Sequence, residues 1–598
     1  MLEALLLASL SVVPFQAAPQ QDARALGRAA RTAQFHYESL LRRRAPYRMG
    51  GGYGGECDEI IGRFCFRFDG EDAPPAPLPE PAHPDIGRAR LAAIRAHRRW
   101  FSAAPASSEA TGALIRYLIE DERWSEALAA ARTHAWAAER TAESLLLLGL
   151  ALHYASDFAA AEAVFDSARA AADPEVRRRW DDVGVLLEPG ERGRYGRLED
   201  SARVDYERVL WAMSDPSLLV PGNERRSGHY ARHAWIQILS EAPRVNGTIS
   251  WGSDHEEILL RYGLPVHRER MRHPIMMHET ELRMVETFDP NAVAFVPAAM
   301  STRGVPEAPP PGVRPELERD TARSAYAPLA HPRLRGLAGQ ASRFPVGSAY
   351  LLRIDALLPP DTLSPRAPIP PRALLAVFDT LGNELSRASA EVEIRSDSST
   401  VVRARVAVPP GTAVYHLEVI GDAGSRGGLA RYRIDLPAVA GLALSDLVVA
   451  EPFGDSLPRS RDDPGLRPLP SLVVPHGRGL GVFAEVSGLD RYPGDARYTV
   501  EWWVEDAEPG SLLGRAFRWL GERLGVVGRP EPLRTRWDGV SDTGSAAVAF
   551  TLDMEDADPG LYRIGLTVRD RVTGEERSAT RLIRVDPSAA GPPVRAPG

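Results

Sequence analysis

The stretch LLLLGLALHYASDFAAAEAVFDSARAAADP, residues 145–174, carries the clearest structural pattern in the chain. Its apolar and small residues recur at spacings of three and four, first over 145–152 and again over 161–168. That spacing places them on one face of an α-helix, so the stretch predicts two helices that pack against each other. The predicted contact residues are Leu145, Leu148, Gly149 and Leu152 in the first helix, Ala161, Phe165 and Ala168 in the second, and Pro174 at the end of the pair.

The same pattern occurs once more in the preceding residues. A shift of 34 residues towards the N-terminus places apolar or small residues at equivalent positions, namely Leu114, Ile115, Leu118, Ala127 and Ala131. A 34-residue period with this pattern resembles the tetratricopeptide repeat. The resemblance implies a helical-repeat region over residues 86–210 whose concave face binds peptides or partner proteins. The alternative is a set of helices that only pack on one another.

The N-terminal segment is typical of exported proteins. Residues 4–15 form an apolar run with the length of a signal-peptide core, and small residues suited to cleavage follow it. The run is too short to cross a bilayer as a helix. We therefore expect residues 1–18 to be a signal peptide that directs the chain to the periplasm or the medium. An internal start or a buried first helix is the alternative.

Residues 19–85 combine an Arg-rich helical segment, a loop with both cysteines of the chain and a Pro-rich linker. Cys57 and Cys65 have seven residues between them. In an exported chain this spacing predicts one disulfide that closes a small loop. A zinc site needs about four ligands, and the nearby sequence offers too few of them. We therefore expect a disulfide and no metal.

Residues 221–265 carry the motif that is most informative about the family. They read PGNERRSGHYARHAWIQILSEAPRVNGTISWGSDHEEILLRYGLP. The segment SWGSD at 250–254, followed by ILLRYGLP at 258–265, resembles the GWxTD domain of exported bacterial proteins, in which Gly-Trp-x-Thr-Asp precedes Tyr-Gly-Pro-Pro. Ser250, Ser253 and Leu264 depart from that pattern. The resemblance implies a small α/β module over residues 211–300 and brings no known activity with it. The motif residues are Trp251, Gly252, Ser253, Asp254, Tyr262, Gly263 and Pro265.

The motif residues also support an interpretation that needs no family. The apolar run at 258–260, followed by Tyr-Gly, predicts a short strand that ends in a turn. Trp251 is an apolar anchor for the preceding loop, and its indole N–H needs a partner. Ser253 and Asp254 are suited to hydrogen bonds with nearby backbone N–H groups. We therefore expect the motif to lock a loop in place.

C-terminal to the motif, the pattern changes to short apolar runs separated by turns. A Pro-rich linker at 301–340 leads into two sets of such runs, which predict immunoglobulin-like β-sandwiches at 341–440 and 441–587. A predicted helix at 507–536 interrupts the second set, and it suits contact with a partner or a membrane surface, or packing on its own sheet. Its apolar face consists of Leu513, Phe517, Leu520 and Leu524. We expect the small-residue tail at 588–598 to be disordered.

Two enzymatic alternatives use residues around the motif. His229 and His233 have the spacing of a helical metal pair, but a zinc peptidase needs Glu directly after the first His and this chain has Tyr. Carboxylates around an imidazole are groups that an envelope hydrolase acting on peptide or glycan would use, which is the alternative function. Its site would consist of Trp251, Asp254, His255 and Glu257. A hydrolase should gather these side chains in a pocket, whereas a scaffold should use them for local bonds and present its broadest apolar patch on the repeats or the inserted helix.

Composition excludes several classes of function. The 598 residues include 80 acidic and 72 basic residues, and the net charge of −8 argues against a general nucleic-acid binder. Every basic residue is Arg, so Schiff-base, phosphate-loop and kinase lysines are absent. We predict a multidomain α plus β fold. The sequence favours an exported, non-enzymatic binding or scaffolding protein of the bacterial cell envelope, which acts through protein–protein contacts without a cofactor or a transmembrane span.

Overall fold

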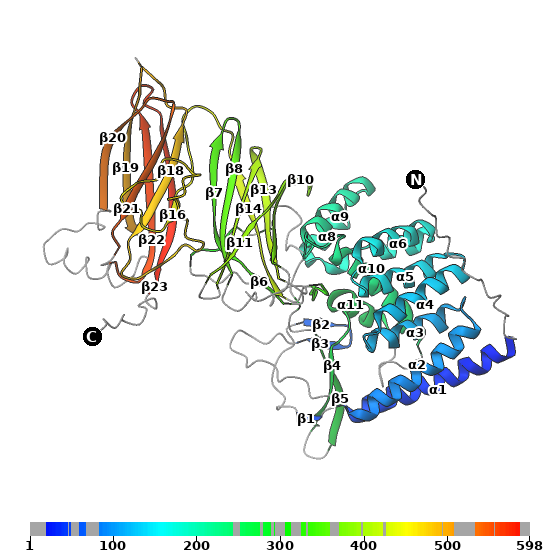
Figure 1. Cartoon of the computed structure of the whole chain (residues 1–598). Helices are drawn as coiled ribbons and strands as arrows, with labels where there is room; N and C mark the ends of the chain where they lie inside the picture. The colour runs from blue at the N-terminus through cyan, green and yellow to red at the C-terminus, as the bar shows by residue number, and fades with distance from the viewer. Residues whose placement is uncertain are drawn as a thin grey trace, which may run out of the picture. The chain divides into compact units, whose positions relative to one another are not determined.

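The computed structural model divides into two compact units (Figure 1). The helical unit consists of Met1–Val185 and Pro221–Pro290, and the β-rich unit consists of Leu186–Val220 and Asn291–Gly598. The predicted combination of an N-terminal helical region and a C-terminal β-rich region is confirmed. The chain passes between the units three times, at 185/186, 220/221 and 290/291. The structure describes residues 20–45, 47–49, 59–66, 83–242, 251–275, 279–288, 292, 305, 307–311, 324–330, 333–358, 370–395, 399–421, 426–492, 494–507, 533–554 and 557–586.

Successive helices pack side by side in the helical unit. Two of them begin after hydroxyl caps, because the side chains of Ser107 and Thr141 accept hydrogen bonds from the backbone N–H groups of Ala110 and Ser144. The helices of this unit are α1 (Gln20–Arg44), α2 (Pro84–Ala103), α3 (Ser108–Glu120), α4 (Trp124–Ala137), α5 (Ala142–Tyr154), α6 (Phe158–Ala171), α7 (Pro174–Asp181), α10 (Glu224–Glu241) and α11 (Ser253–Tyr262).

Two helix pairs repeat at the predicted interval. Helices α3 and α5 begin and end 34 residues apart, and so do α4 and α6. The turns inside the pairs repeat as well, since Glu122 and Ser156 both have left-handed backbone, with φ of 56° and 60°. Gly149 shows why the crossing needs a small residue: a Cβ there would lie 2.4 Å from the Phe165 ring. The predicted contact between α5 and α6 is confirmed.

Helix α10 covers one face of these repeated pairs. Its Ile238 side chain lies against Gly112 of α3, and its Trp235 indole N–H donates a hydrogen bond to the Tyr154 hydroxyl of α5 at 3.1 Å. Side chains from α2 to α6 and from α10 share one apolar core. A segment of the same chain therefore occupies this face of the repeats.

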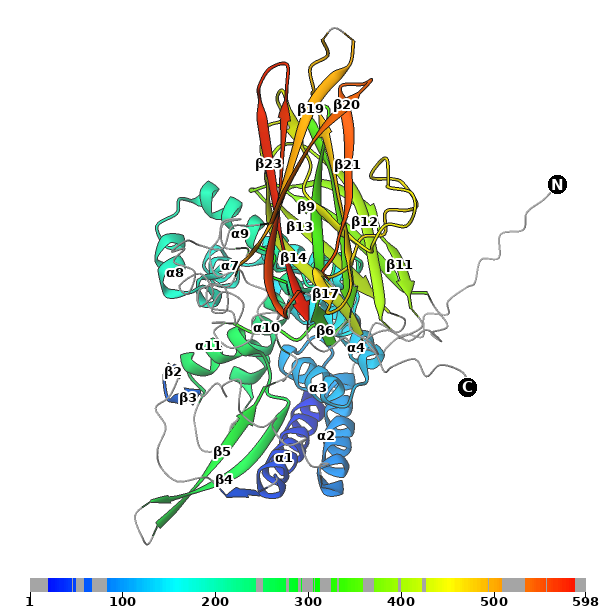
Figure 2. The same cartoon turned by 90° about the vertical axis from the view of Figure 1, so that its left-hand side faces the viewer.

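The strands of the helical unit form two small sheets. Strands β4 (His267–Ile275) and β5 (Glu279–Thr287) form a long antiparallel hairpin (Figure 2). Strand β1 (Tyr47–Met49) pairs with β4 in parallel. Strands β2 (Glu59–Ile61) and β3 (Phe64–Phe66) form a separate hairpin that contacts α11. This β2–β3 hairpin positions the partners of the sequence motif.

One secondary-structure prediction was wrong. Residues 258–260 lie in helix α11, not in a strand. Extended backbone at Gly252 precedes the helix, Asp254 and Glu256 lie in its first turn, and Gly263 follows it with φ of 80°. These are start and stop signals of a helix. A short apolar run has no periodicity of its own, so these flanking signals and burial in the helical core decide its structure.

The β-rich unit contains two successive pairs of sheets (Figure 1). The first pair has strand orders β10-β9-β13-β14-β6 and β11-β12-β8-β7. The second pair has order β17-β23-β22-β19-β20 and order β15-β18-β16, with β21 also paired to β18. The strands are β6 (Arg333–Gly336), β7 (Ala338–Val346), β8 (Ala349–Leu358), β9 (Arg372–Phe378), β10 (Glu384–Ser389), β11 (Glu391–Ile394), β12 (Thr400–Val408), β13 (Gly411–Ile420), β14 (Arg426–Leu436), β15 (Ala443–Leu444), β16 (Val448–Ala450), β17 (Val473–Pro475), β18 (Leu480–Ser487), β19 (Ala496–Asp506), β20 (Leu533–Ser541), β21 (Ser545–Leu552), β22 (Gly560–Asp570) and β23 (Glu576–Asp586).

Each sheet pair encloses its own apolar core. The first core joins residues of β8 and β12 to residues of β9 and β13, and the second joins β18 and β21 to β19 and β22. At Ala390 the chain leaves one sheet of the first pair and enters the other, between β10 and β11. The Tyr562 hydroxyl donates a hydrogen bond to the Asp558 carbonyl at 2.8 Å, at the predicted entry to a late strand.

Two helices belong to the β-rich unit, although they lie before α10 in the sequence. They are α8 (Pro189–Tyr195) and α9 (Asp200–Ser214). Val209 and Met213 of α9 pack on Phe378 of the first sheet pair. The predicted domain boundary at residue 210 therefore lies inside α9.

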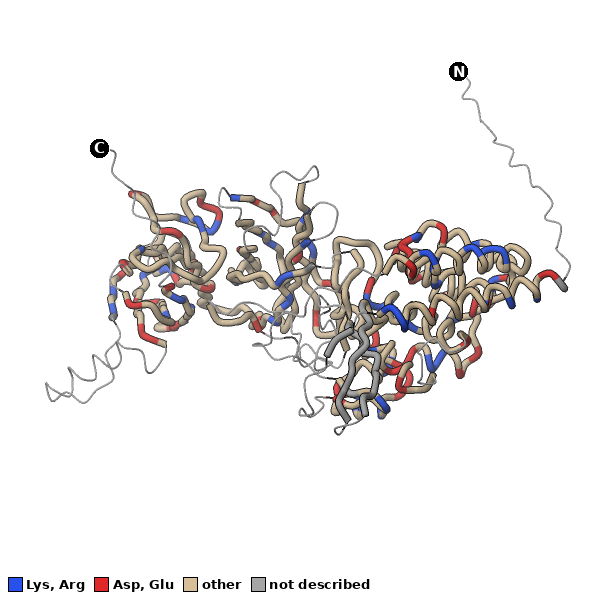
Figure 3. The backbone as a smooth tube through the Cα atoms, turned by 90° about the horizontal axis from the view of Figure 1, so that it is seen from below, with Lys and Arg blue, Asp and Glu red and all other residues tan. Residues whose placement is uncertain are grey.

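Acidic and basic residues are interspersed along the helices of the helical unit (Figure 3). Among the described residues, no helix combines the length and the apolar composition needed to cross a membrane.

Candidate functional site

The sequence motif lies where the β2–β3 hairpin meets the start of α11. The Arg63 guanidinium of the hairpin donates to both carboxylate oxygens of Asp254, with Nε–Oδ2 at 2.5 Å and Nη2–Oδ1 at 2.6 Å. The backbone N–H of Arg63 also donates to Oδ2, at 3.2 Å. These hydrogen bonds hold the pKa of the Asp254 carboxyl well below its usual range. The carboxylate is therefore ionised and fully engaged at neutral pH.

This fit depends on a glycine in the hairpin turn. Gly62 has φ of 54°, and a Cβ at that position would lie 2.6 Å from the Asp254 Cβ. Both the left-handed backbone and the close approach favour glycine. The turn can therefore bring Arg63 directly onto the motif carboxylate.

Aromatic rings fill the space beside this ion pair. Trp251 stacks on the His255 ring, with centroids 5.2 Å apart and planes 16° apart. Phe64 of the hairpin packs edge-on against the same imidazole, with ring centroids 4.8 Å apart. Trp251 is partly buried against the helical core, and its indole N–H has no hydrogen-bond partner in the described part of the chain. That Trp251 anchors the preceding loop stays a prediction, because residues 243–250 lie outside the described residues.

The same hairpin is held again at the far end of α11. Glu59 of β2 accepts hydrogen bonds from Arg261 at 2.7 Å and from the Tyr262 hydroxyl at 2.8 Å. Arg261 is almost fully buried. Beside Gly263, the Arg232 guanidinium donates to the carbonyls at the end of α11, including that of Leu260 at 2.7 Å. The motif residues at both ends of α11 therefore fasten one hairpin along the helix.

The three acidic residues of the motif helix are each bonded to a different arginine. Asp254 pairs with Arg63, Glu256 with Arg179 at 2.6 Å, and Glu257 with Arg261 at 3.3 Å. A general acid for hydrolysis needs a carboxyl whose pKa is raised. The pKa of Asp254 is shifted in the opposite direction. Of the predicted hydrolase site, Asp254 and Glu257 are held in separate ion pairs with arginines, and Trp251 stacks on His255.

The two histidines of the possible metal pair lie in the core of the helical unit. The rings of His229 and His233 are 4.9 Å apart and nearly perpendicular. The Nε2 atom of His229 lies 2.9 Å from the Trp180 carbonyl, so a backbone group already satisfies it. Burial lowers the pKa of His233 to about 3. No group of His, Cys, Asp and Glu suited to a metal occurs among the described residues.

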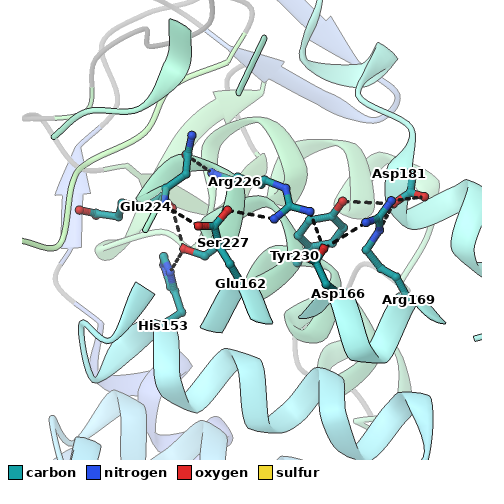
Figure 4. A network of polar contacts seen from close by, with 10 residues as sticks. His153, Glu162, Asp166, Arg169, Asp181, Glu224, Arg226, Ser227 and Tyr230 are labelled. Atoms are coloured by element: carbon teal, nitrogen blue, oxygen red, sulfur yellow. Dashed lines mark hydrogen bonds and ion pairs between the residues drawn. The ribbon is translucent and has the colours of Figure 1, made fainter. Parts of the chain in front are cut away.

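A charged seam between α6, α7 and α10 was not predicted from the sequence (Figure 4). Arg226 of α10 bonds to Glu162 at 2.9 Å and to Asp166 at 2.5 Å, both on α6. Arg169 pairs with Asp181, whose carboxylate also accepts a hydrogen bond from the Tyr230 hydroxyl. The two guanidinium groups lie over the Tyr230 ring at 5.6 and 5.4 Å. The seam fastens α10 to the second helix pair.

A second unpredicted cluster is buried in the β-rich unit. Glu418 accepts hydrogen bonds from the Ser217 hydroxyl and from the Leu218 backbone N–H, and lies 3.2 Å from Nε2 of His416. Ser, His and Glu resemble a nucleophilic triad, but here Ser217 donates to the acid instead of the imidazole. All three side chains are buried. The cluster therefore joins the segment after α9 to strand β13 instead of presenting a nucleophile.

Several predicted site residues lie outside the described residues. Cys57 is one of them, and Cys65 lies in β3 without a described side chain. The predicted disulfide and the signal peptide at 1–18 therefore stay predictions. The same holds for the tail at 588–598 and for the apolar helix face, which comprises Leu513, Phe517, Leu520 and Leu524.

We expect the pair of Arg63 and Asp254 to control the order of the β2–β3 hairpin. Replacing Asp254→Asn removes the charge that binds Arg63, so hydrogen exchange over residues 59–66 should become at least about tenfold faster. The double variant with Arg63→Met should lose no more protection than the single variant. Hydrogen exchange followed by mass spectrometry measures both.

A matched control lies on the same helix. Glu256→Gln breaks the neighbouring ion pair with Arg179 and should leave exchange in the hairpin unchanged. Equal acceleration by Glu256→Gln and Asp254→Asn would show that the hairpin responds to any change in α11, contrary to this assignment.

Comparisons with known proteins assign no family to the chain. No protein-family model and no curated protein matches it. Similar solved structures include a β-glucosidase from Listeria innocua (14 % identity, TM-score 0.14, 25 % of this chain and 17 % of that one). A second is a calcium-binding mutant of Bacteroides uniformis β-glucuronidase 2 (10 % identity, TM-score 0.14, 40 % of this chain and 27 % of that one). A third is native alpha-2-macroglobulin from Escherichia coli (12 % identity, TM-score 0.15, 85 % of this chain and 60 % of that one). The chain spans less than two thirds of each of these proteins, and likeness at such TM-scores carries no argument about fold or function.

Proposed function

We propose that this chain is an exported protein of the bacterial cell envelope that binds and scaffolds other proteins and performs no chemistry at its GWxTD-like motif. The observation that supports this most directly is that the motif residues hold the β2–β3 hairpin against α11. Asp254 is bound by Arg63 and Tyr262 by Glu59, so the polar groups of the motif hold the β2–β3 hairpin. A motif whose polar groups make contacts within the chain fits a structural role.

The architecture supports the finer parts of this proposal. The 34-residue offset of the α3–α4 and α5–α6 pairs is that of tetratricopeptide-like repeats, which serve protein–protein contacts. The hydrogen bond from Tyr562 to a carbonyl four residues upstream matches the tyrosine corner of immunoglobulin-like sandwiches. Helical repeats and sandwiches in one chain give extended binding surfaces.

The proposal places the protein in the periplasm or the medium, after removal of residues 1–18. Oxidising conditions there suit a disulfide between Cys57 and Cys65. The predicted apolar helix within residues 507–536 provides a second surface for a partner or for peripheral membrane contact.

The test is the native size and location of the protein in its own cells. A tagged chain should fractionate with the envelope, and blue-native electrophoresis of mild detergent extracts should place it in a complex well above the 65.2 kDa of the chain. The purified chain alone is the size reference. Recovery in the cytoplasm, or migration with the purified chain, would contradict the proposal.

A second arm addresses the hydrolase alternative. Cells that carry Asp254→Asn should show no accumulation of an envelope polymer, provided that the variant protein is present at the normal level. Accumulation of peptidoglycan fragments or of another envelope glycan in those cells would refute a purely structural motif.

A further inference from the structure

The most exposed large apolar side chain in the described residues lies on the repeated helices. Trp136, in the last turn of α4, is 84 % exposed. It lines an open hollow of about 330 Å³ between α4 and α5. The other residues around this hollow are Arg132, Ala135, Glu139, Arg140 and Leu148. We call it the Trp136 hollow.

The backbone places two arginines beside the indole. Arg132 lies one helical turn before Trp136, on the same face of α4. After α4 ends, Glu139 and Arg140 both have left-handed backbone, with φ of 51° and 55°, and the Arg140 N–H bonds back to the Ala135 carbonyl at 2.8 Å. This tight turn keeps Arg140 next to the helix end. Leu148 of α5 is nearly buried and forms the apolar base of the hollow.

Both arginines have side chains without a partner within the described part of the chain. Neither Arg132 nor Arg140 makes an ion pair or a side-chain hydrogen bond there. By contrast, Arg98 of α2 and Arg123, which precedes α4, both form ion pairs with Glu126. Glu139 is the one acidic residue at the hollow. The hollow therefore combines an uncovered indole with two unpaired guanidinium groups.

We propose that the Trp136 hollow binds an acidic segment of a partner protein, with an apolar side chain of that segment on the indole and its carboxylates on Arg132 and Arg140. Trp and Arg are the residue types that dominate binding hot spots. A guanidinium forms directional, charge-assisted hydrogen bonds with carboxylates, which selects acidic over basic segments. The proposal rests on the proposed binding function and adds its surface and the chemistry of its partner.

The position of α10 strengthens the choice of this surface. Tetratricopeptide-like pairs offer one face to a ligand, but in this chain α10 packs on α3 and α5 through Ile238 and Trp235. Side chains of the same chain therefore take up contacts that a peptide would make there. The Trp136 hollow involves α4 and α5 and leaves α10 in place.

The probe is a phage-displayed library of random dodecapeptides, selected on the purified full-length chain. The selected peptides should be enriched in Asp and Glu next to Leu, Phe or other apolar residues. One of them, synthesised with a fluorescein label, should bind with an affinity that falls at least about 30-fold in Trp136→Ala, the loss expected of a hot-spot residue. The charge-reversed variant Arg132→Glu/Arg140→Glu should lose at least as much.

Matched controls exist for both changes, and Trp136 is exposed enough for its loss to leave folding intact. Tyr492→Ala removes another exposed aromatic residue, and Arg177→Glu/Arg178→Glu makes the same charge change on α7; both should bind the peptide like the wild type. Absence of enriched acidic peptides, or equal binding by Trp136→Ala, would overturn the proposal. A dimer in light scattering that Trp136→Ala dissociates would overturn it as well, because a second copy would then be the occupant.

These outcomes separate the hollow from the broader function. If the envelope complex forms but the peptides do not depend on Trp136, the binding surface lies elsewhere and the proposed function stands. If no envelope complex forms, the proposed function fails whatever the peptides do.

Discussion

At pH 5 the helical unit should be less stable than at pH 7 by about 6 kcal/mol, because it buries several neutral histidines. Burial lowers the pKa of His97 to about 4, and the pKa values of His153 and His233 to about 3. The unfolded chain has ordinary histidines with a pKa of about 6.5. At pH 5 the unfolded state therefore binds a proton at each site and the folded state does not, which costs about 2 kcal/mol per histidine.

The direction of this effect defines its pH window. A histidine whose pKa is depressed by folding contributes its full stability above pH 6.5, and that stability is lost as the pH falls towards the folded-state value. Carboxylates whose pKa is lowered by folding, such as Asp254, change the stability only as the pH falls below their ordinary pKa of about 4. A titration between pH 7 and pH 5 therefore isolates the histidines. A loss of about 6 kcal/mol is comparable with the whole stability of many domains, so unfolding should begin near pH 5.

The measurement is urea denaturation at both pH values, with hydrogen exchange assigning the loss to α2, α5 and α10, which carry these histidines. His97→Leu is the sharpest variant, because His97 is fully buried and neither ring nitrogen has a hydrogen-bond partner in the described residues. It should reduce the loss between pH 7 and pH 5 by about 2 kcal/mol. Replacing the exposed His36 by Leu should leave the loss unchanged. Equal stability at pH 7 and pH 5 in the wild type would contradict the prediction.

Local patterns in the sequence were sufficient for the helical region, the β-rich region and their order along the chain. The spacing around Gly149 and Phe165 predicts two packed helices because each contact residue repeats every three or four positions, and the structure confirms the pair. The alternation of apolar runs and turns likewise predicts the strands of the β-rich unit. These signals are carried by neighbouring residues, so a single sequence contains them.

Such local patterns could not predict contacts between segments that lie far apart in the sequence. The partner of Asp254 is Arg63, 191 residues away, and nothing near either residue signals the pair. The run at 258–260 was predicted as a strand because its packing partners were unknown. Helix α9 belongs to the β-rich unit because Val209 and Met213 find an apolar surface on its first sheet pair. Contacts between distant segments decided these cases, together with the helix start and stop signals around residues 258–260.

The largest single-residue effect should come from Glu418→Ala, which we expect to destabilise the β-rich unit by about 3–5 kcal/mol. Glu418 is fully buried and Arg431 is partly buried, and they lie on either side of His416. Burial alone raises the pKa of Glu418, but hydrogen bonds from His416, Ser217 and Leu218 outweigh it and hold that pKa below its ordinary value. Removal of the carboxylate takes away one of the two negative charges, with Asp215, that balance the Arg431 guanidinium. It also leaves the Ser217 hydroxyl and the Leu218 N–H without their buried acceptor.

The geometry also defines where the damage should appear. Arg431 donates to Nδ1 of His416 at 3.1 Å, so the imidazole carries its proton on Nε2, facing Glu418. The same guanidinium holds the carbonyls of Met213 and Asp215 at the end of α9. Loss of Glu418 should therefore accelerate hydrogen exchange in α9 and β13 before the second sheet pair responds. Hydrogen exchange and urea denaturation measure the two effects.

Two further variants make this prediction decisive. Glu393→Ala removes an exposed carboxylate paired with Arg403 in the same sheet pair and should cost less than about 1 kcal/mol, as exposed ion pairs do. Glu418→Leu combined with Arg431→Met removes both charges together and should be less damaging than the sum of the single changes, because the two groups are coupled through the His416 ring that lies between them. A double variant that costs the full sum would show that the two charges act independently, and the buried cluster would then be several separate contacts instead of one coupled anchor for α9.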